Sequence, residues 1–168
     1  MMKIALLFSS KAGMAASLRR RLEETAVAVN EEDGDEPPPP DAFAECDSDE
    51  TISAVAAALR KRYEVIPLES DEEAYPRLRE TRPDLVFNIA EGFEGRCREA
   101  LVPALCEWLR IPYTGSDPLT LSVSLDKVAA KRLVAPDVLA PRSARVRPGA
   151  PVDGLRFPLV LKPRCEGS

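Results

Sequence analysis

Three short apolar runs, separated by segments of helical periodicity, constrain the fold of this chain more than any other feature. The runs cover residues 3–8, 63–68 and 84–89, and each has the length and continuity of a buried strand. The order strand, helix, strand, helix, strand predicts a parallel sheet, because parallel strands are joined by right-handed helical crossovers. The sequence therefore predicts a three-layer α/β fold with helices on both faces of the sheet.

The segments between the runs follow the period of amphipathic helices. From Ile52 to Leu59 the apolar residues recur at i, i+3, i+4 and i+7, which places them on one helical face. Residues 47–50 supply capping oxygens and negative charge where a helix dipole favours them. Pro103 is compatible with a helix only in its first turn. Further helices are expected over residues 12–24, 71–81, 101–109 and 121–134.

Two further strands are expected beyond the predicted sheet. Residues 111–116 read as a short strand and turn, and residues 157–161 are strand-like and lead into the turn-like residues 162–168. We expect the last strand to be one arm of a hairpin whose second arm is missing, because the sequence stops there. An unpaired strand edge predicts that the chain tends to associate.

Residues 31–40 combine an acidic cluster with four consecutive prolines. Such a segment cannot bury apolar surface, and prolines interrupt both helices and sheet ladders. The acidic residues lack the alternating ligand spacing of a calcium loop, so a solvated loop is favoured over a cation site. The sequence predicts a flexible surface loop here.

Composition excludes several classes of function. The chain has 168 residues, a net charge of -5 and no basic cluster beyond Arg19 to Arg21, which disfavours nucleic acid as a partner. The absence of histidine excludes Ser-His-Asp and Cys-His mechanisms and the common zinc sites. Four cysteines without a C-x-x-C pair indicate reduced thiols. No apolar run reaches the roughly 18 residues that span a bilayer, so a cytoplasmic protein without a membrane partner is expected.

Candidate site residues lie in two loops that follow predicted strands. Ser9 and Ser10 follow the first strand, and Glu91 and Gly92 follow the third, where ligands of such sheets gather. Neither a Walker A loop nor a G-x-G-x-x-G fingerprint is present. Gly92 and Gly95 could let backbone amides approach an anion, and a flexible turn is the alternative interpretation.

Three lysines complete the set of candidates. Lys127 and Lys131 stand four residues apart on one predicted helix, a spacing that also occurs on ordinary solvated faces. Lys162 lies between an apolar strand and Pro163, where a fixed backbone could present its ammonium group to a charged ligand.

The order of several motifs resembles the D-alanyl-D-alanine ligases and their ATP-grasp relatives. The motifs are residues 84–92, 111–118, 125–133, 157–163 and 166–168. The resemblance implies a Rossmann-like pre-ATP-grasp domain over residues 1–118 and a truncated ATP-grasp domain over residues 119–168. It also implies contacts with the phosphates of ATP by the side chain of Lys127, by Lys162 and by a closing loop that begins at Glu166, Gly167 and Ser168.

The resemblance further implies a reaction and its partners. A substrate carboxylate attacks the terminal phosphate of ATP, and an amine displaces the resulting acyl phosphate, as in peptidoglycan precursor synthesis. Magnesium ligands lie further along such enzymes, so this piece is expected to be inactive alone, and a homodimer is implied. Many of these ligases have a His-Gly pair where this chain has Glu91-Gly92, which leaves the joined substrates open. The alternative is a non-catalytic Rossmann-like module for a small ligand or partner.

Overall fold

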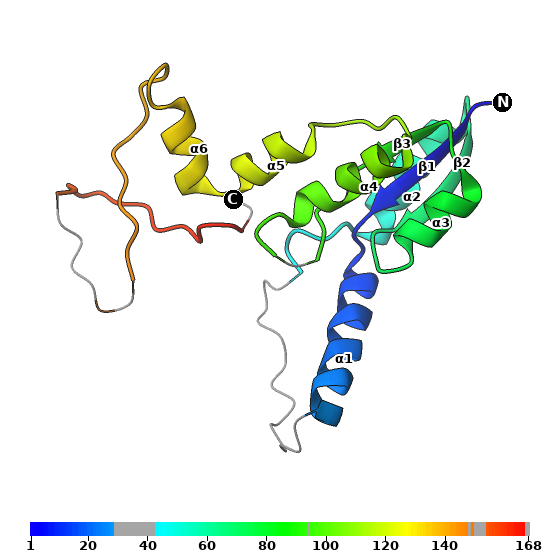
Figure 1. Cartoon of the computed structure of the whole chain (residues 1–168), viewed down its shortest axis with the longest axis horizontal. Helices are drawn as coiled ribbons and strands as arrows, with labels where there is room; N and C mark the ends of the chain where they lie inside the picture. The colour runs from blue at the N-terminus through cyan, green and yellow to red at the C-terminus, as the bar shows by residue number, and fades with distance from the viewer. Residues whose placement is uncertain (29–42, 94, 148, 150–153, 167–168) are drawn as a thin grey trace.

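A parallel sheet forms the centre of this computed structural model, which describes residues 1–28, 43–93, 95–147, 149 and 154–166, with side chains of 21–28 left out (Figure 1). Within these residues the sheet has three strands in the order β2-β1-β3. They are β1 (Lys3–Phe8), β2 (Glu64–Glu69) and β3 (Leu85–Asn88).

The central strand has parallel neighbours on both sides. Ile4 is paired with Val65 of β2 and with Leu85 of β3. The four inner residues of β1 are buried, as expected for a strand with covered faces and paired edges. The predicted parallel α/β fold is confirmed.

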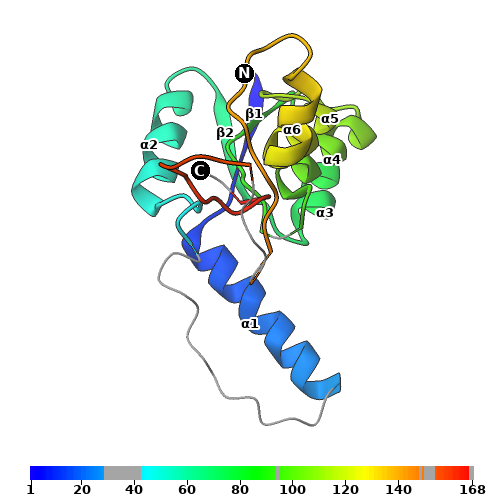
Figure 2. The same ribbon diagram turned by 90° about the vertical axis from the view of Figure 1, so that its left-hand side faces the viewer.

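Helices cover both faces of the sheet. Figure 2 shows α2 (Asp49–Arg60) on one side of the strands and α3 (Ala74–Thr81) and α4 (Leu101–Leu109) on the other, while α1 (Lys11–Ala28) projects beyond the ends of the strands. The side chain of Ser48 accepts a hydrogen bond from the backbone of Thr51 and caps α2, which confirms the capping expected there. The other described helices are α5 (Pro118–Leu125) and α6 (Lys127–Val134), and a 3-10 turn lies at Arg98–Ala100.

The hydrophobic core lies between the sheet and the layer of α3 and α4. Leu7 and Val86 of the strands pack with Leu78 of α3. From α4, Val102 and Cys106 join the same cluster, and burial raises the pKa of the Cys106 thiol to about 12. Pro103 lies in the first turn of α4, as predicted.

One predicted helix is wrong. Residues 121–134 form two helices instead of one, because Asp126 adopts an extended conformation between α5 and α6. Its Oδ1 atom accepts hydrogen bonds from the backbone N–H groups of Val128 and Ala129, both at 3.1 Å. These bonds satisfy donors that have no partner inside a new helix, so Asp126 starts α6 as its N-cap.

The two additional strands were not found as predicted. Residues 111–116 contribute only an isolated parallel bridge, between Tyr113 and Val86. Residues 157–161 form no strand, and Val160 and Leu161 are 82% and 84% exposed. A strand needs a hydrogen-bonding neighbour, and no described segment pairs with residues 157–161.

Three other expectations concern the loop at residues 31–40, the cysteines and the crossing of a membrane. The predicted loop at residues 31–40 lies outside the described residues. The four cysteines are all free. None of the described helices combines the length and apolar character needed to cross a membrane.

Candidate functional site

The ends of the three parallel strands meet at Ser9. This residue follows β1 and is fully buried. Its hydroxyl oxygen lies 2.8 Å from that of Ser70, which follows β2, and accepts a hydrogen bond of 3.0 Å from the backbone N–H of Gly92, which follows β3. The structure therefore brings two predicted substrate-side residues together, but the Ser9 side chain serves to join the strand ends.

Ser10 is engaged by a residue that the sequence did not single out. Glu69, at the end of β2, accepts hydrogen bonds from the backbone N–H of Ser10 at 2.7 Å and from its hydroxyl at 2.6 Å. A Cβ atom on Gly13 would lie 2.5 Å from the Glu69 carboxyl carbon. Glycine at position 13 thus leaves room for this carboxylate at the first turn of α1. A negative charge is favoured there, because the N-terminus of a helix carries partial positive charge.

Two carboxyl groups at the same edge of the sheet have a pKa raised above its ordinary value. Burial raises the pKa of Glu91 above its ordinary value, and the negative charges of Glu99 and Glu45 raise it further, whereas Arg98 opposes the shift. Burial likewise raises the pKa of Glu69, against the hydrogen bonds from Ser10. The edge is therefore electrostatically negative.

Arg98 connects this edge to the C-terminal part of the chain. Its side chain is only 5% exposed. The guanidinium donates to the carbonyl oxygen of Cys165 at 2.7 Å, donates to the Glu45 carboxylate, and lies 3.5 Å from the Glu166 carboxylate. The chain also packs tightly here, because a Cβ atom on Gly92 would lie 2.4 Å from the carbonyl oxygen of Arg98.

A second ionic cluster holds the C-terminal segment against α6. Asp126 accepts hydrogen bonds from Arg164, at 2.9 and 2.5 Å, and from Arg96 at 2.8 Å. The Arg164 guanidinium is the main cause that holds the pKa of Asp126 well below its usual range, with help from the N–H groups of α6 and from Arg96. Asp126 was missed, although it immediately precedes Lys127 in a motif of the sequence.

The structure brings together only some of the phosphate-side residues, which are the residues predicted to contact the phosphates of ATP: Lys127, Lys162, Glu166, Gly167 and Ser168. The backbone N–H of Lys127 donates to the Arg164 carbonyl oxygen at 3.1 Å, and its ammonium group donates to the carbonyl oxygen of Glu166. Lys162 is exposed on the segment that leads into these residues. Gly167 and Ser168 lie outside the described residues. Contacts with phosphates by these residues stay a prediction.

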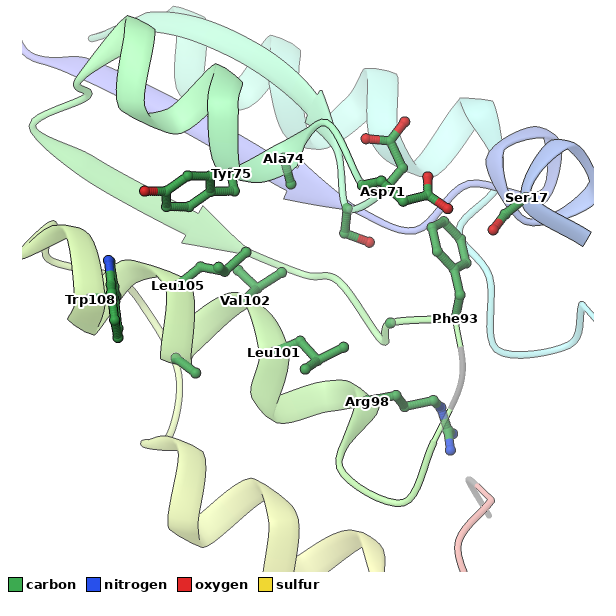
Figure 3. A pocket seen from close by; sticks show the side chains of 14 residues that line it. Ser17, Asp71, Ala74, Tyr75, Phe93, Arg98, Leu101, Val102, Leu105 and Trp108 are labelled. Atoms are coloured by element: carbon green, nitrogen blue, oxygen red, sulfur yellow. The ribbon is translucent and has the colours of Figure 1, made fainter. Parts of the chain in front are cut away.

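A pocket of about 630 Å³ opens beside the strand ends, between α3 and α4 (Figure 3). Ser70 and Gly92 line it where the strands end, and neither Lys127 nor Lys162 does. Across the described part of the chain, no group of three or more His, Cys, Asp or Glu side chains is placed to hold a metal ion. The other residues that line the pocket come mostly from α3 and α4 and are largely apolar.

Sequence comparisons relate about two thirds of the chain to known proteins. It is 38% identical over 124 residues to the uncharacterized protein y4sG of Sinorhizobium fredii, covering 68% of this chain and 37% of that protein. It is 36% identical over 117 residues to a D-alanine–D-alanine ligase of Ruegeria pomeroyi, and 39% identical over 117 residues to one of Cereibacter sphaeroides. Both matches cover 67% of this chain and 38% of the relative. The chain therefore spans less than half the length of these relatives.

Comparisons with protein-family models and with solved structures give weaker results. No protein-family model matches the chain. A crystal structure of D-alanine–D-alanine ligase from Bacillus anthracis aligns with a TM-score of 0.45 at 18% identity, covering 82% of this chain and 35% of that one. A structure of the same enzyme in complex with ATP gives the same TM-score at 17% identity. Structural likeness at this level supports no conclusion about function.

Proposed function

This chain belongs with the D-alanine–D-alanine ligases by sequence, and we propose that it is part of an ATP-dependent enzyme that joins a carboxylate to an amine. The observation that carries the proposal is the identity of 36% and 39% to two such ligases over two thirds of the chain. Because the chain spans less than half of each relative, the activity belongs to a longer protein than the residues described above.

The proposed domain boundary lies near residue 118, between a substrate-side domain over residues 1–118 and the start of an ATP-binding domain over residues 119–168. Two contacts join the two proposed domains. Arg96 donates to Asp126, and Arg98 donates to the carbonyl oxygen of Cys165. Such contacts would hold the strand ends next to the phosphate-side residues, as a reaction between bound carboxylate and nucleotide requires.

In the proposed reaction the substrate carboxylate attacks the terminal phosphorus of ATP, and the bond from that phosphorus to the ADP oxygen breaks. The amine then attacks the acyl carbon, and inorganic phosphate leaves. The proposed roles of Lys127 and Lys162 are to hold phosphate oxygens and to offset their charge. In such ligases the magnesium ligands lie further along the chain, so we assign no step to a metal ion and expect the 168-residue chain alone to be inactive.

The identity of the joined substrates is part of the proposal. The Glu91 carboxyl group lies among other acidic groups at the strand ends, where a neutral or protonated donor would be needed to face a substrate carboxylate. We therefore propose small-molecule carboxylate and amine substrates without restricting them to D-alanine. A cytoplasmic location and a homodimer remain parts of the same proposal.

The decisive experiment uses the complete reading frame that contains this chain. Release of ADP and phosphate would be measured with a panel of amino acids and amines, and the joined product would be identified by mass spectrometry. Product formation that depends on ATP is expected for the longer protein, and no turnover is expected for the 168-residue chain. A longer protein without affinity for ATP, or turnover by the short chain at the rate of the longer one, would contradict the proposal.

One observation favours a second candidate, a non-catalytic binding module. The hydroxyl groups of Ser9 and Ser10 are both committed to contacts that hold the strand ends together. A binding module would retain this architecture without chemistry. A stop codon directly after Ser168, together with ligand binding but no ATP turnover, is the result that this candidate predicts.

A further inference from the structure

The pocket between α3 and α4 has two chemically different ends. Figure 3 shows Asp71 and Ser17 near one end, next to Phe93, and Tyr75 and Trp108 near the other. Most of the wall is apolar, and its volume of about 630 Å³ falls within the roughly 300–1,000 Å³ of small-molecule sites. Alanine, whose side chain is a single methyl group, would leave most of this space empty.

The charge at the polar end is negative. Asp71 and Glu72 line it together with the hydroxyl groups of Ser17 and Ser70. Arg98 is the positive group in the lining, but its guanidinium is already bonded to Glu45 and to the Cys165 carbonyl oxygen. Glu72 is paired with Arg20 at 3.1 Å, whereas no cation among the described residues pairs with Asp71. A ligand that enters this end therefore meets the Asp71 carboxylate, which favours an ammonium group over a carboxylate.

Two large apolar side chains that line the pocket are exposed to solvent. Leu101 is 55% exposed and Trp108 is 80% exposed, and both line the pocket. Aromatic rings from Tyr75, Phe93 and Trp108 are spread along the whole pocket. Such rings bind apolar groups, and their faces also attract cations.

We propose that this pocket binds a small amine that carries a bulky apolar or aromatic group. The ammonium group would lie near Asp71, and the apolar group would contact Leu101, Leu105 and Trp108. The inference rests on the proposed function in one respect, since such a compound would be the amine substrate of the ligase. Binding itself requires neither ATP nor turnover.

Titration calorimetry on the 168-residue chain tests the proposal with three probes of similar shape, namely 2-phenylethylamine, 2-phenylethanol and 3-phenylpropionate. The chain contains one tryptophan, so a change in its fluorescence reports directly on Trp108. We expect saturable binding of the amine, binding of the alcohol at least about fivefold weaker and no binding of the carboxylate. Equal affinities for all three probes, or no binding of the amine, would overturn the proposal.

Two variants locate the site. Asp71→Asn retains an oxygen that can accept the hydrogen bond from the backbone N–H of Glu73 and removes the charge, so we expect amine affinity to fall about fivefold. Leu101→Lys at an exposed position should weaken it at least as much. Glu80→Gln removes an exposed charge from α3 outside the pocket and should leave affinity unchanged. Equal affinities in all three variants would refute the site.

The outcomes keep the two proposals apart. Amine binding by the short chain, together with a longer protein that never uses ATP, would uphold the pocket and refute the ligase. ATP-dependent ligation of small amino acids without binding of 2-phenylethylamine would uphold the ligase and refute the pocket.

Discussion

The sheet with its helices and the segment from residue 135 onward are held in place by different forces. In the first region, side chains such as Leu7, Leu78 and Val86 are fully buried. In the second, large apolar side chains such as Leu139 and Phe157 are 103% and 88% exposed. The contacts of this segment with the rest of the described chain run mainly through Asp126, Arg98 and Lys127. Burial of apolar surface fixes the sheet, whereas charged groups and carbonyl oxygens hold the segment.

The largest test of this comparison removes buried surface. Leu78→Ala should lower the free energy of unfolding by about 3 kcal/mol, since a buried leucine leaves a cavity in the core. The same change at Leu139, which is fully exposed, is the matched control and should alter stability by less than about 0.5 kcal/mol. Denaturant unfolding of both variants measures the difference, and similar losses would show that the segment packs more than its exposure indicates.

A smaller effect is expected where the strand ends approach the turn at Arg98. Gly92 has a φ of +71°, and an added Cβ atom would lie 2.4 Å from the carbonyl oxygen of Arg98. Gly92→Ala should therefore lower the free energy of unfolding by about 2 kcal/mol. Gly115 also has a positive φ, of +103°, but has open space around it, so Gly115→Ala isolates the cost of backbone strain. Equal losses of stability in Gly92→Ala and Gly115→Ala would show that close packing at Gly92 adds nothing to the cost of backbone strain.

Detachment of the C-terminal segment should affect local order more than global stability. Asp126→Asn removes the charge that binds Arg164 and Arg96. We expect cleavage between residues 154 and 166 by a broad-specificity protease to become several times faster, because local opening exposes that backbone. Asp137→Asn, on an exposed carboxylate nearby in sequence, should leave the rate unchanged. An unchanged rate in Asp126→Asn would mean that other contacts hold the segment.

The smallest expected effect is a pH dependence with opposite signs in the two regions. The raised pKa of Glu91 means that the folded state prefers its protonated form, so its contribution is most favourable below the ordinary pKa of 4.5 and is lost as pH rises through the folded value. Glu91→Gln should thus stabilise the chain at pH 7, by less than about 1 kcal/mol, and the gain should fade below pH 4.5.

The lowered pKa of Asp126 gives the reverse sign. Its contribution is present above the ordinary pKa of 3.8 and is lost as pH falls through the lower folded value. Unfolding curves of Glu91→Gln and of the unmodified chain, measured from pH 3 to pH 7, test the first sign. Segment proteolysis by an acid-active protease, followed as the pH falls below 3.8, tests the second. A gain from Glu91→Gln that grows on acidification would contradict the assignment.

The sequence predicted the elements of the sheet region because their signals are local. Apolar runs gave the three strands, and the stripe from Ile52 to Leu59 gave α2. The break at Asp126 was missed because an apolar period continues on both sides of it, although a capping residue marked the position.

The contacts of the candidate site could not be predicted in the same way. Glu69 binds Ser10 from 59 positions away, and Arg98 reaches Cys165 across 67 positions. Such partners are chosen by the packing of the whole sheet, and no local period announces them. The sequence could predict which residues follow the strands, and Ser9, Ser10 and Gly92 do lie at the strand ends. Their hydrogen-bond partners and their burial could be found only from the structure.

The carboxylate of Asp126 performs two tasks at once. It begins α6 by accepting from the backbone of Val128 and Ala129, and it anchors the chain's last described turn by accepting from Arg164. Folding of that helix and docking of that turn are consequently interdependent, so that each lowers the entropic cost of ordering the other. A single proton on this one side chain would loosen both together.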